Sequence, residues 1–103
     1  MVNYNNARLY TIRSPYTKKF YIGSTCNSFT KRLSQHKNNY KTYLINDKPK
    51  RLFVSVYDIF DCGDVYIELL KICPCENKIQ LHKIEGETIR KHKKDCVNMR
   101  IAG

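Results

Sequence analysis

One acidic residue, Glu85, interrupts an otherwise apolar helical pattern near the end of the chain. It lies four residues from both Leu81 and Ile89, so a helix over about residues 77–91 places its carboxylate on the stripe that faces the core. A carboxylate in that position is costly unless it is paired or binds a metal ion. A metal site is therefore one interpretation, and a stripe-edge carboxylate paired with a lysine is the other. Glu87 points away and is expected to be a solvated surface charge.

Other patterns exclude several kinds of active site. No pair of carboxylates has the spacing of a metal site, and no glycine-rich loop is present that would cradle a phosphate. No nucleophilic serine motif is present either. What remains beside Glu85 is a tyrosine-rich N-terminal segment and a basic segment that carries Arg32 and His36. These two residues are four apart, so they project from one side of a helix.

Five cysteines raise the question of a zinc site. Such a site would draw on Cys73, Cys75, His82, Cys96 or His92. Cys73 and Cys75 are separated by one proline, which lacks the two-residue gap of the standard zinc templates. The odd count and the absence of a secretory signal indicate reduced thiols in a cytosolic or nuclear compartment. We expect the cysteines to pack as small buried hydrophobic residues.

Positive charge is concentrated in the first half of the chain. The formal net charge is +10, and residues 1–51 carry eleven basic residues and one acidic residue, whereas residues 52–103 carry eight of each. This asymmetry indicates a surface that faces a polyanion. A basic surface kept for solubility is the alternative. The residues expected to bind nucleic acid are Arg13, Lys18, Lys19, Lys31, Lys37 and Lys41.

The periodicity predicts the elements that position these residues. Residues 9–12 and 20–23 are rich in β-branched and aromatic side chains and flank turn-forming residues 14–19, which predicts a β-hairpin. A helix capped by Asn27 or Ser28 follows and runs to about Tyr40. The later segments are expected as a loop over 40–51, a short helix over 52–60 with a strand as the alternative, a strand over 65–72, a helix over 77–91 and a closing segment over 95–101.

The predicted order is therefore β-β-α-α-β-α, in an α/β (α+β) sandwich with a small, largely antiparallel three-stranded sheet. The 103 residues suit a single domain over the whole chain. No apolar run approaches the ~20 residues that a membrane span needs. No long amphipathic stripe is left for an obligate dimer interface, so a monomer is expected.

These pieces, in this order, resemble the motifs of the GIY-YIG nuclease family. The similarity covers nearly the whole chain, and the chain most resembles the short stand-alone versions found in large DNA viruses. Arg8 replaces the first glycine of the family, and residues 40–51 contain no equivalent of the extra His or Lys of some members. The motifs stand as Arg8-Leu9-Tyr10-Thr11-Ile12, Tyr21-Ile22-Gly23, Arg32 with His36, Lys83-Ile84-Glu85-Gly86-Glu87-Thr88-Ile89, and Cys96-Val97-Asn98.

The resemblance implies a metal-dependent DNA endonuclease without a small-molecule cofactor. Glu85 would bind one Mg²⁺ or Mn²⁺ ion, because a hard cation prefers oxygen ligands. Tyr10 would orient or deprotonate the attacking water, and Arg32 would stabilise charge on the phosphorus. Because the chain holds one such set, it would cut one strand at a time. The remaining roles are a hydrogen bond across the site for Tyr21, contact with water or phosphate for His36, and support without substrate contact for Asn98.

Each of these residues also has an ordinary structural interpretation. Tyr10 and Tyr21 are then ordinary aromatic residues of a sheet. Arg32 is one more phosphate clamp, His36 is a helix-surface residue, and Asn98 caps a turn. Two further functions stay open on the sequence alone. One is a DNA-binding module that keeps the fold without turnover, and the other is an RNA-binding or structural basic protein.

Overall fold

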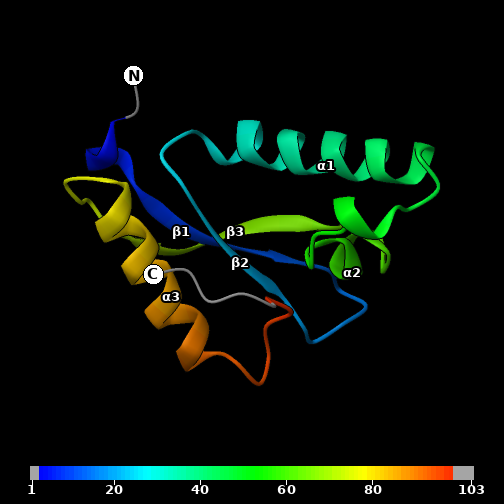
Figure 1. Cartoon of the computed structure of the whole chain (residues 1–103). Helices are drawn as coiled ribbons and strands as arrows, with labels where there is room; N and C mark the ends of the chain where they lie inside the picture. The colour runs from blue at the N-terminus through cyan, green and yellow to red at the C-terminus, as the bar shows by residue number, and fades with distance from the viewer. Residues whose placement is uncertain (1–2, 99–103) are drawn as a thin grey trace.

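A three-stranded antiparallel sheet lies between two layers of helices (Figure 1). The computed structural model describes residues 3–98. The order of strands and helices confirms the expected α+β class. The elements are a 3-10 turn Tyr4–Asn6, β1 Arg8–Arg13, β2 Tyr21–Thr25, α1 Phe29–Ile45, a 3-10 turn Lys50–Leu52, α2 Tyr57–Phe60, β3 Tyr66–Ile72 and α3 Lys78–Lys91.

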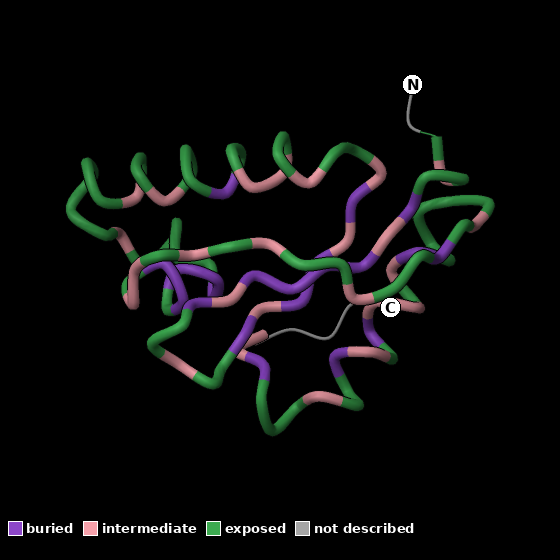
Figure 2. Tube along the Cα trace, turned by 180° about the vertical axis from the view of Figure 1, so that it is seen from behind, coloured by how far each residue is buried: buried purple, intermediate pink, exposed green. Residues whose placement is uncertain are grey.

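The central strand is β1, which pairs with β2 on one side and β3 on the other. Both of its faces are covered, so the buried residues follow the strand through the middle of the molecule (Figure 2). Tyr10 and Ile12 face α1 and α2 in one core cluster, whereas Leu9 faces α3 in another. This alternation is what a strand produces, because successive side chains leave opposite faces. Tyr10 is thereby placed on the α1 side.

The helix α1 begins as expected and ends later than expected. Ser28 caps it by accepting a hydrogen bond from the Lys31 backbone amide. The predicted loop over 40–51 is wrong at its start, because residues 40–45 belong to α1. The reason lies in packing: Tyr40 and Tyr43 continue the buried stripe of the helix. The Tyr40 ring stacks on Phe60 and the Tyr43 ring lies against Tyr57, with centroid distances of 5.1 and 4.8 Å.

The predicted helix over 52–60 is much shorter in the structure, because only Tyr57–Phe60 is helical. Positive φ angles at Asp47 and Lys48, 60° and 55°, reverse the chain after α1. Pro49 then precedes a single 3-10 turn. The branched side chains of Val54 and Val56 lower the helix propensity of the segment between. Tyr57, Ile59 and Phe60 reach the core from the one turn that remains.

The helix α3 covers the other face of the sheet, much as predicted. Asn77 caps its start, and Leu81 and Ile89 are buried against the sheet. The following segment returns to β2, where the Phe20 amide donates to the Asp95 carbonyl (3.1 Å) and the Val97 amide to the Phe20 carbonyl (2.8 Å). The closing segment is therefore present as far as Asn98, and its residues 99–101 lie outside the described residues. None of the described helices is both long and apolar enough to cross a bilayer.

The cysteines are free thiols with mixed exposure. Cys73 and Cys96 are buried, as expected for small hydrophobic residues, and Cys26, Cys62 and Cys75 are partly exposed. Within residues 3–98, no group of three or more His, Cys, Asp or Glu side chains is arranged to hold a metal ion. The zinc alternative therefore finds no support in the described part of the chain.

Candidate active site

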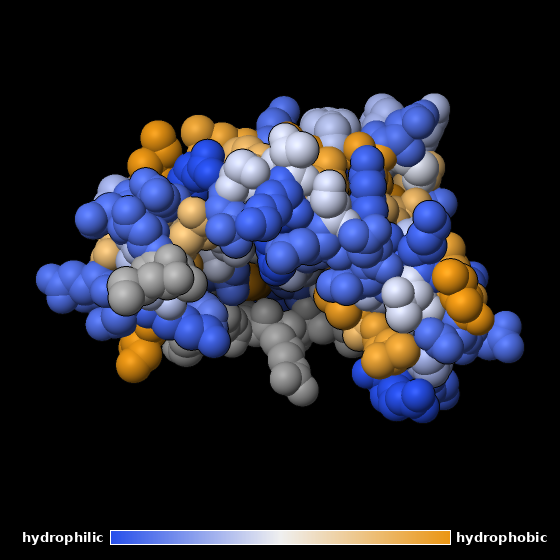
Figure 3. All heavy atoms as spheres, turned by 90° about the horizontal axis from the view of Figure 1, so that it is seen from above, coloured by the Kyte–Doolittle hydropathy of each residue, from blue (hydrophilic) through white to orange (hydrophobic). Residues whose placement is uncertain are grey.

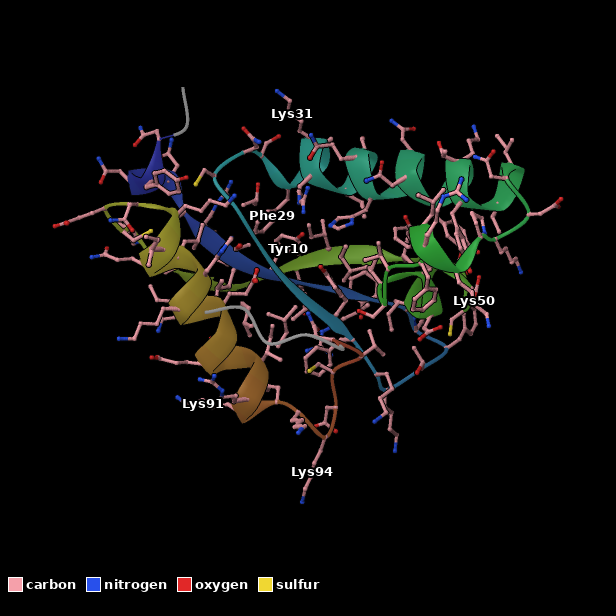
Figure 4. The ribbon with its side chains drawn as sticks, in the orientation of Figure 1. Tyr10, Phe29, Lys31, Lys50, Lys91 and Lys94 are labelled. Atoms are coloured by element: carbon pink, nitrogen blue, oxygen red, sulfur yellow. The ribbon has the colours of Figure 1, made fainter. Side chains whose placement is uncertain are left out.

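The side chain of Tyr10 on β1 lies over Gly23, its neighbour on β2. The two residues are in register between β1 and β2. A Cβ atom added to Gly23 would lie 2.4 Å from both Cζ and Oη of Tyr10, which no side chain permits. The absence of a side chain at Gly23 therefore lets the Tyr10 ring lie over β2, toward the edge of the sheet. Figure 4 shows Tyr10 beneath α1, with Phe29 beside it.

The Tyr10 hydroxyl is held between two side chains of α1. Arg32 Nε donates to it at 3.0 Å, and His36 Nε2 lies 2.7 Å away on its other side. Arg32 and His36 are one helical turn apart, so the helix presents both to the same atom. Gln35 fixes the guanidinium in turn, because its Oε1 accepts from Arg32 Nη1 at 3.1 Å. These contacts bring together three of the residues expected from the sequence.

Burial sets the protonation of this group. Burial and the Arg32 charge together lower the pKa of His36 to about 4, so its imidazole is neutral at pH 7. Burial also raises the pKa of Tyr10 well above its ordinary value, although the Arg32 charge acts in the opposite direction. Tyr10 is therefore a phenol that accepts from Arg32. When the His36 ring proton is on Nδ1, the Tyr10 hydroxyl donates to His36 Nε2 across the 2.7 Å contact.

Tyr21 stands beside His36 on β2. Its ring meets the His36 ring edge-on, with a centroid distance of 5.7 Å. Burial raises the pKa of Tyr21, and the nearby Glu85 charge raises it further. Its hydroxyl makes no hydrogen bond to another residue within 3–98. Among the described residues, the contact of Tyr21 with this group is therefore the one between the two rings.

Glu85 approaches from the opposite layer of the molecule. It lies on α3, and Ser24 on β2 lies close to its carboxylate. Burial raises the pKa of Glu85, while Ser24 and the Arg32 charge lower it. The Glu85 charge raises the pKa of Tyr21 and the Arg32 charge lowers that of Glu85, so the three side chains lie near one another on the β2 side of the sheet.

Glu85 has the properties of a ligand for a hard cation. It is half-buried, and it forms no ion pair with another residue in the described range. The interpretation in which Glu85 pairs with a lysine is therefore not met there. Mg²⁺ keeps several water ligands and is commonly bound by one or two carboxylates together with substrate phosphates. A half-buried carboxylate without an ion-pair partner is compatible with such an ion, whereas one carboxylate does not supply the four-ligand shell of structural zinc.

Asn98 acts on the backbone of β2. Its Oδ1 accepts from the Ile22 amide at 2.9 Å, and its Nδ2 donates to the Ile22 carbonyl at 2.8 Å. β2 is an edge strand, so these two groups of Ile22 would otherwise lack a strand partner. Ile22 stands between Tyr21 and Gly23, and the amide of Asn98 therefore holds the strand at the point where the site is built.

The basic residues expected to bind nucleic acid are placed in different surroundings. Lys31, Lys37 and Lys41 are exposed on α1, and Lys31 points away from Tyr10 (Figure 4). Seen from above, hydrophilic residues cover much of the molecule (Figure 3). Arg13 is occupied within the protein, since its guanidinium lies over the Phe20 ring at 4.3 Å and its Nε lies 3.5 Å from Glu68. Lys18 is exposed at the hairpin turn, and Lys19 Nζ donates to the Lys94 carbonyl at 2.5 Å.

Sequence reasoning did not single out Ser24 and Gln35, and it did not foresee the contact made by Gly23. Ser24 and Gln35 are common polar residues whose partners become visible only in three dimensions. Gly23 did carry a signal, because a glycine inside a strand often marks a close approach of another group.

The comparison with known proteins agrees with this geometry. The GIY-YIG catalytic domain matches residues 6–100 of the chain. No curated protein and no solved structure matches it significantly. Since the matched segment takes in almost all of the 103 residues, the chain belongs to the GIY-YIG family, a family of nuclease type whose members are typically endonucleases.

Proposed function

We propose that the protein is a metal-dependent endonuclease that hydrolyses phosphodiester bonds of DNA, one strand at a time. The observation that carries this proposal is the Tyr10 hydroxyl, held at 3.0 Å from Arg32 Nε and 2.7 Å from His36 Nε2. A phenol that only packs in a core does not need a guanidinium and a neutral imidazole on its oxygen. The same three groups, in this protonation state, are suited to move a proton.

In the proposed reaction Tyr10 relays a proton from the attacking water. Its oxygen accepts the proton of the water while its own proton passes to His36 Nε2. The raised pKa of Tyr10 makes a free phenolate unfavourable, so the transfer to His36 removes the need to form one. The neutral state of His36, with its pKa lowered to about 4, leaves Nε2 ready to accept at pH 7. The water oxygen then forms the new bond to phosphorus as the bond to the 3′ oxygen breaks.

Arg32 stabilises the negative charge that develops on the phosphoryl oxygens. A guanidinium has five N–H donors. Tyr10 and Gln35 take one each, so others stay available for the substrate. Gln35 also limits the rotation of the guanidinium, which keeps those donors in place before DNA binds. Preorganised donors of this kind typically contribute about 100- to 1000-fold to a rate.

Glu85 would hold one Mg²⁺ or Mn²⁺ ion at the β2 edge. When bound, such an ion neutralises charge on the departing oxygen and on a phosphate oxygen. Ser24 lies close to the Glu85 carboxylate and favours its ionised form. The half-buried position keeps the carboxylate away from the lysines of the surface, so it stays free for a cation.

The proposed partner is DNA, bound by a monomer. The net charge of +10, which residues 1–51 carry in full, suits a polyanion. The residues proposed for contacts with the phosphates are Lys18, Lys19, Lys31, Lys37 and Lys41, whereas Arg13 is occupied by Glu68 and Phe20. One set of site residues accommodates one scissile phosphate, and the second strand runs in the opposite direction. We therefore expect nicked circles to accumulate before linear plasmid.

A plasmid nicking assay with two glutamate variants tests the proposal. Supercoiled DNA is incubated with the protein and Mg²⁺ or Mn²⁺, and nicked and linear forms are followed with time. Glu85→Gln removes the charge with little change in shape and should abolish nicking while DNA binding is retained. Glu87→Gln is the matched control on the exposed side of the same helix and should cut as the parent does. Binding without any nicking by the parent protein would favour an inactive DNA-binding module instead.

A further inference from the structure

A cavity opens at the end of the sheet where β1 begins and β2 ends. Its volume is about 430 Å³, which is near the lower end for small-molecule sites. It lies between the N-terminal 3-10 turn, the connection from β2 to α1 and the last residue of β3 (Figure 1). The lining residues that matter here are Asn5, Asn6, Arg8, Asn27, Ser28 and Ile72.

The cavity is next to the hydrogen-bonded set of Tyr10, Arg32 and His36. Arg8 and Tyr10 are alternate residues of β1, so their side chains leave the same face of the sheet. The Arg8 guanidinium lies 4.5 Å from the centroid of the Phe29 ring, and that ring lies 5.9 Å from the Tyr10 ring. Phe29 thus separates the cavity from the site by one side chain. Nucleotides of one strand follow each other at about 3.4 Å along a duplex axis, so the cavity is within about three nucleotides of Tyr10.

The walls of the cavity offer hydrogen bonds rather than charge. Among the described residues that line it, Arg8 alone is charged. The side-chain amides of Asn5, Asn6 and Asn27 form no hydrogen bond with another residue in the described range, so their donors and acceptors are available to a ligand. A pocket for phosphate would need more cations than Arg8. Side-chain amides instead match the edges of nucleobases, and the best match is that of asparagine to adenine N6 and N7.

The remaining two walls are the Arg8 guanidinium and the Ile72 side chain. Arg8 is fixed, because its Nη2 donates to the Asn27 carbonyl at 2.6 Å while its guanidinium stacks on Phe29. Ile72 is 64% exposed at the end of β3, which leaves an apolar surface for the face of a planar ring. A planar guanidinium, an apolar surface and amide groups are together what an unstacked base requires.

We propose that this cavity receives an unpaired nucleobase of the DNA strand being cut, with adenine preferred, within three nucleotides of the scissile phosphate. The proposal rests on the proposed function, since it places the base relative to Tyr10. A base inside a duplex is not able to enter the cavity without leaving its stack. The enzyme therefore favours strands with unpaired or easily opened bases next to the cut.

Binding of single strands in the presence of EDTA tests the cavity without any cleavage. Two fluorescent probes are compared, an oligothymidylate and the same strand with its central thymines replaced by adenines. The parent protein should bind the adenine probe roughly 5- to 100-fold more tightly, as expected for one good amide–base pair. Asn6→Ala combined with Asn27→Ala should lower the affinity for the adenine probe to that for the thymine probe.

Asn38→Ala combined with Asn39→Ala is the matched control, because these exposed asparagines of α1 lie outside the cavity. This control should keep the preference for adenine. Equal affinities of the parent protein for both probes, or a preference that survives in the cavity variant, would overturn the proposal. If the adenine preference fails while nicking is intact, only the proposal of a base pocket is refuted. If nicking is absent while the adenine preference is intact, only the proposed hydrolysis is refuted.

Discussion

The close approach of Tyr10 to Gly23 leads to a sharp expectation for Gly23→Ala. The added Cβ would lie 2.4 Å from Tyr10 Cζ and Oη and 2.9 Å from Cε1. Carbon atoms in contact are normally about 3.5 Å apart, so the ring must move by about 1 Å. The Tyr10 hydroxyl is 2.7 Å from His36 and 3.0 Å from Arg32, and a shift of that size breaks at least one of these hydrogen bonds. A misplacement of 1 Å in an active site costs about 100-fold in rate.

We therefore expect Gly23→Ala to nick plasmid about 100-fold more slowly, with nearly unchanged affinity for DNA. The assay is the initial rate of nicking, with binding measured separately in EDTA. Gly63→Ala is the control, because Gly63 has a φ of 87° and no atom within 4 Å of an added Cβ. That variant should lose some stability through backbone strain while it keeps its rate.

A double-mutant cycle separates displacement of the hydroxyl from general damage. If Gly23→Ala acts by moving the Tyr10 hydroxyl, then adding Tyr10→Phe should reduce the rate little further. Full activity of Gly23→Ala would refute the reasoning, since it would show that the rate does not depend on the observed position of the Tyr10 ring. Additive losses in the double variant would refute it as well, because they would show that the two residues act separately.

Three further predictions concern the same group of residues. Burial and Arg32 lower the pKa of His36 from 6.5 to about 4, so protonation favours the unfolded chain as the pH falls through this window. The parent should therefore lose up to about 3 kcal/mol of unfolding free energy between pH 6.5 and 4. His36→Gln should not show this loss, as urea titrations at several pH values will reveal. Asn98→Ala removes both hydrogen bonds to Ile22 and should cost about 2 kcal/mol in the same assay, whereas a loss below about 0.5 kcal/mol would contradict the proposed support of β2. Arg32→Ala and Tyr10→Phe should each slow nicking by at least about 100-fold, and a Tyr10→Phe protein with full rate across pH would make Tyr10 a packing residue.

The parts of the fold that the sequence predicted well are those with a strong local pattern. The hairpin of residues 9–12 and 20–23 and the helix over 77–91 combine clear periodicity with turn or capping residues, and both are present. The segment between 40 and 60 lacks such a pattern. Its conformation depends on rings that are distant in sequence, such as Tyr43 against Tyr57, so local propensity alone misjudged both helices there.

The same contrast holds for the candidate site. Arg32 and His36 were expected on one side of a helix from their spacing, and they do meet at one atom. The identity of that atom, the Tyr10 hydroxyl, depends on strand register and on the absent side chain of Gly23. The proximity of Ser24 on β2 to Glu85 on α3 follows no sequence pattern, which is why the sequence did not indicate it.

The division of the site between the two layers also orders its assembly in time. Ribosomes synthesise a chain from its N-terminus, so the first elements of a domain emerge seconds before the last ones. Tyr10, Arg32 and His36 all lie within the first 36 residues of this chain, whereas Glu85 lies on the last described helix. A nascent or prematurely terminated chain therefore carries Tyr10, Arg32 and His36 without Glu85. Under the proposed function, translation delays activity until the helix that bears Glu85 has been made.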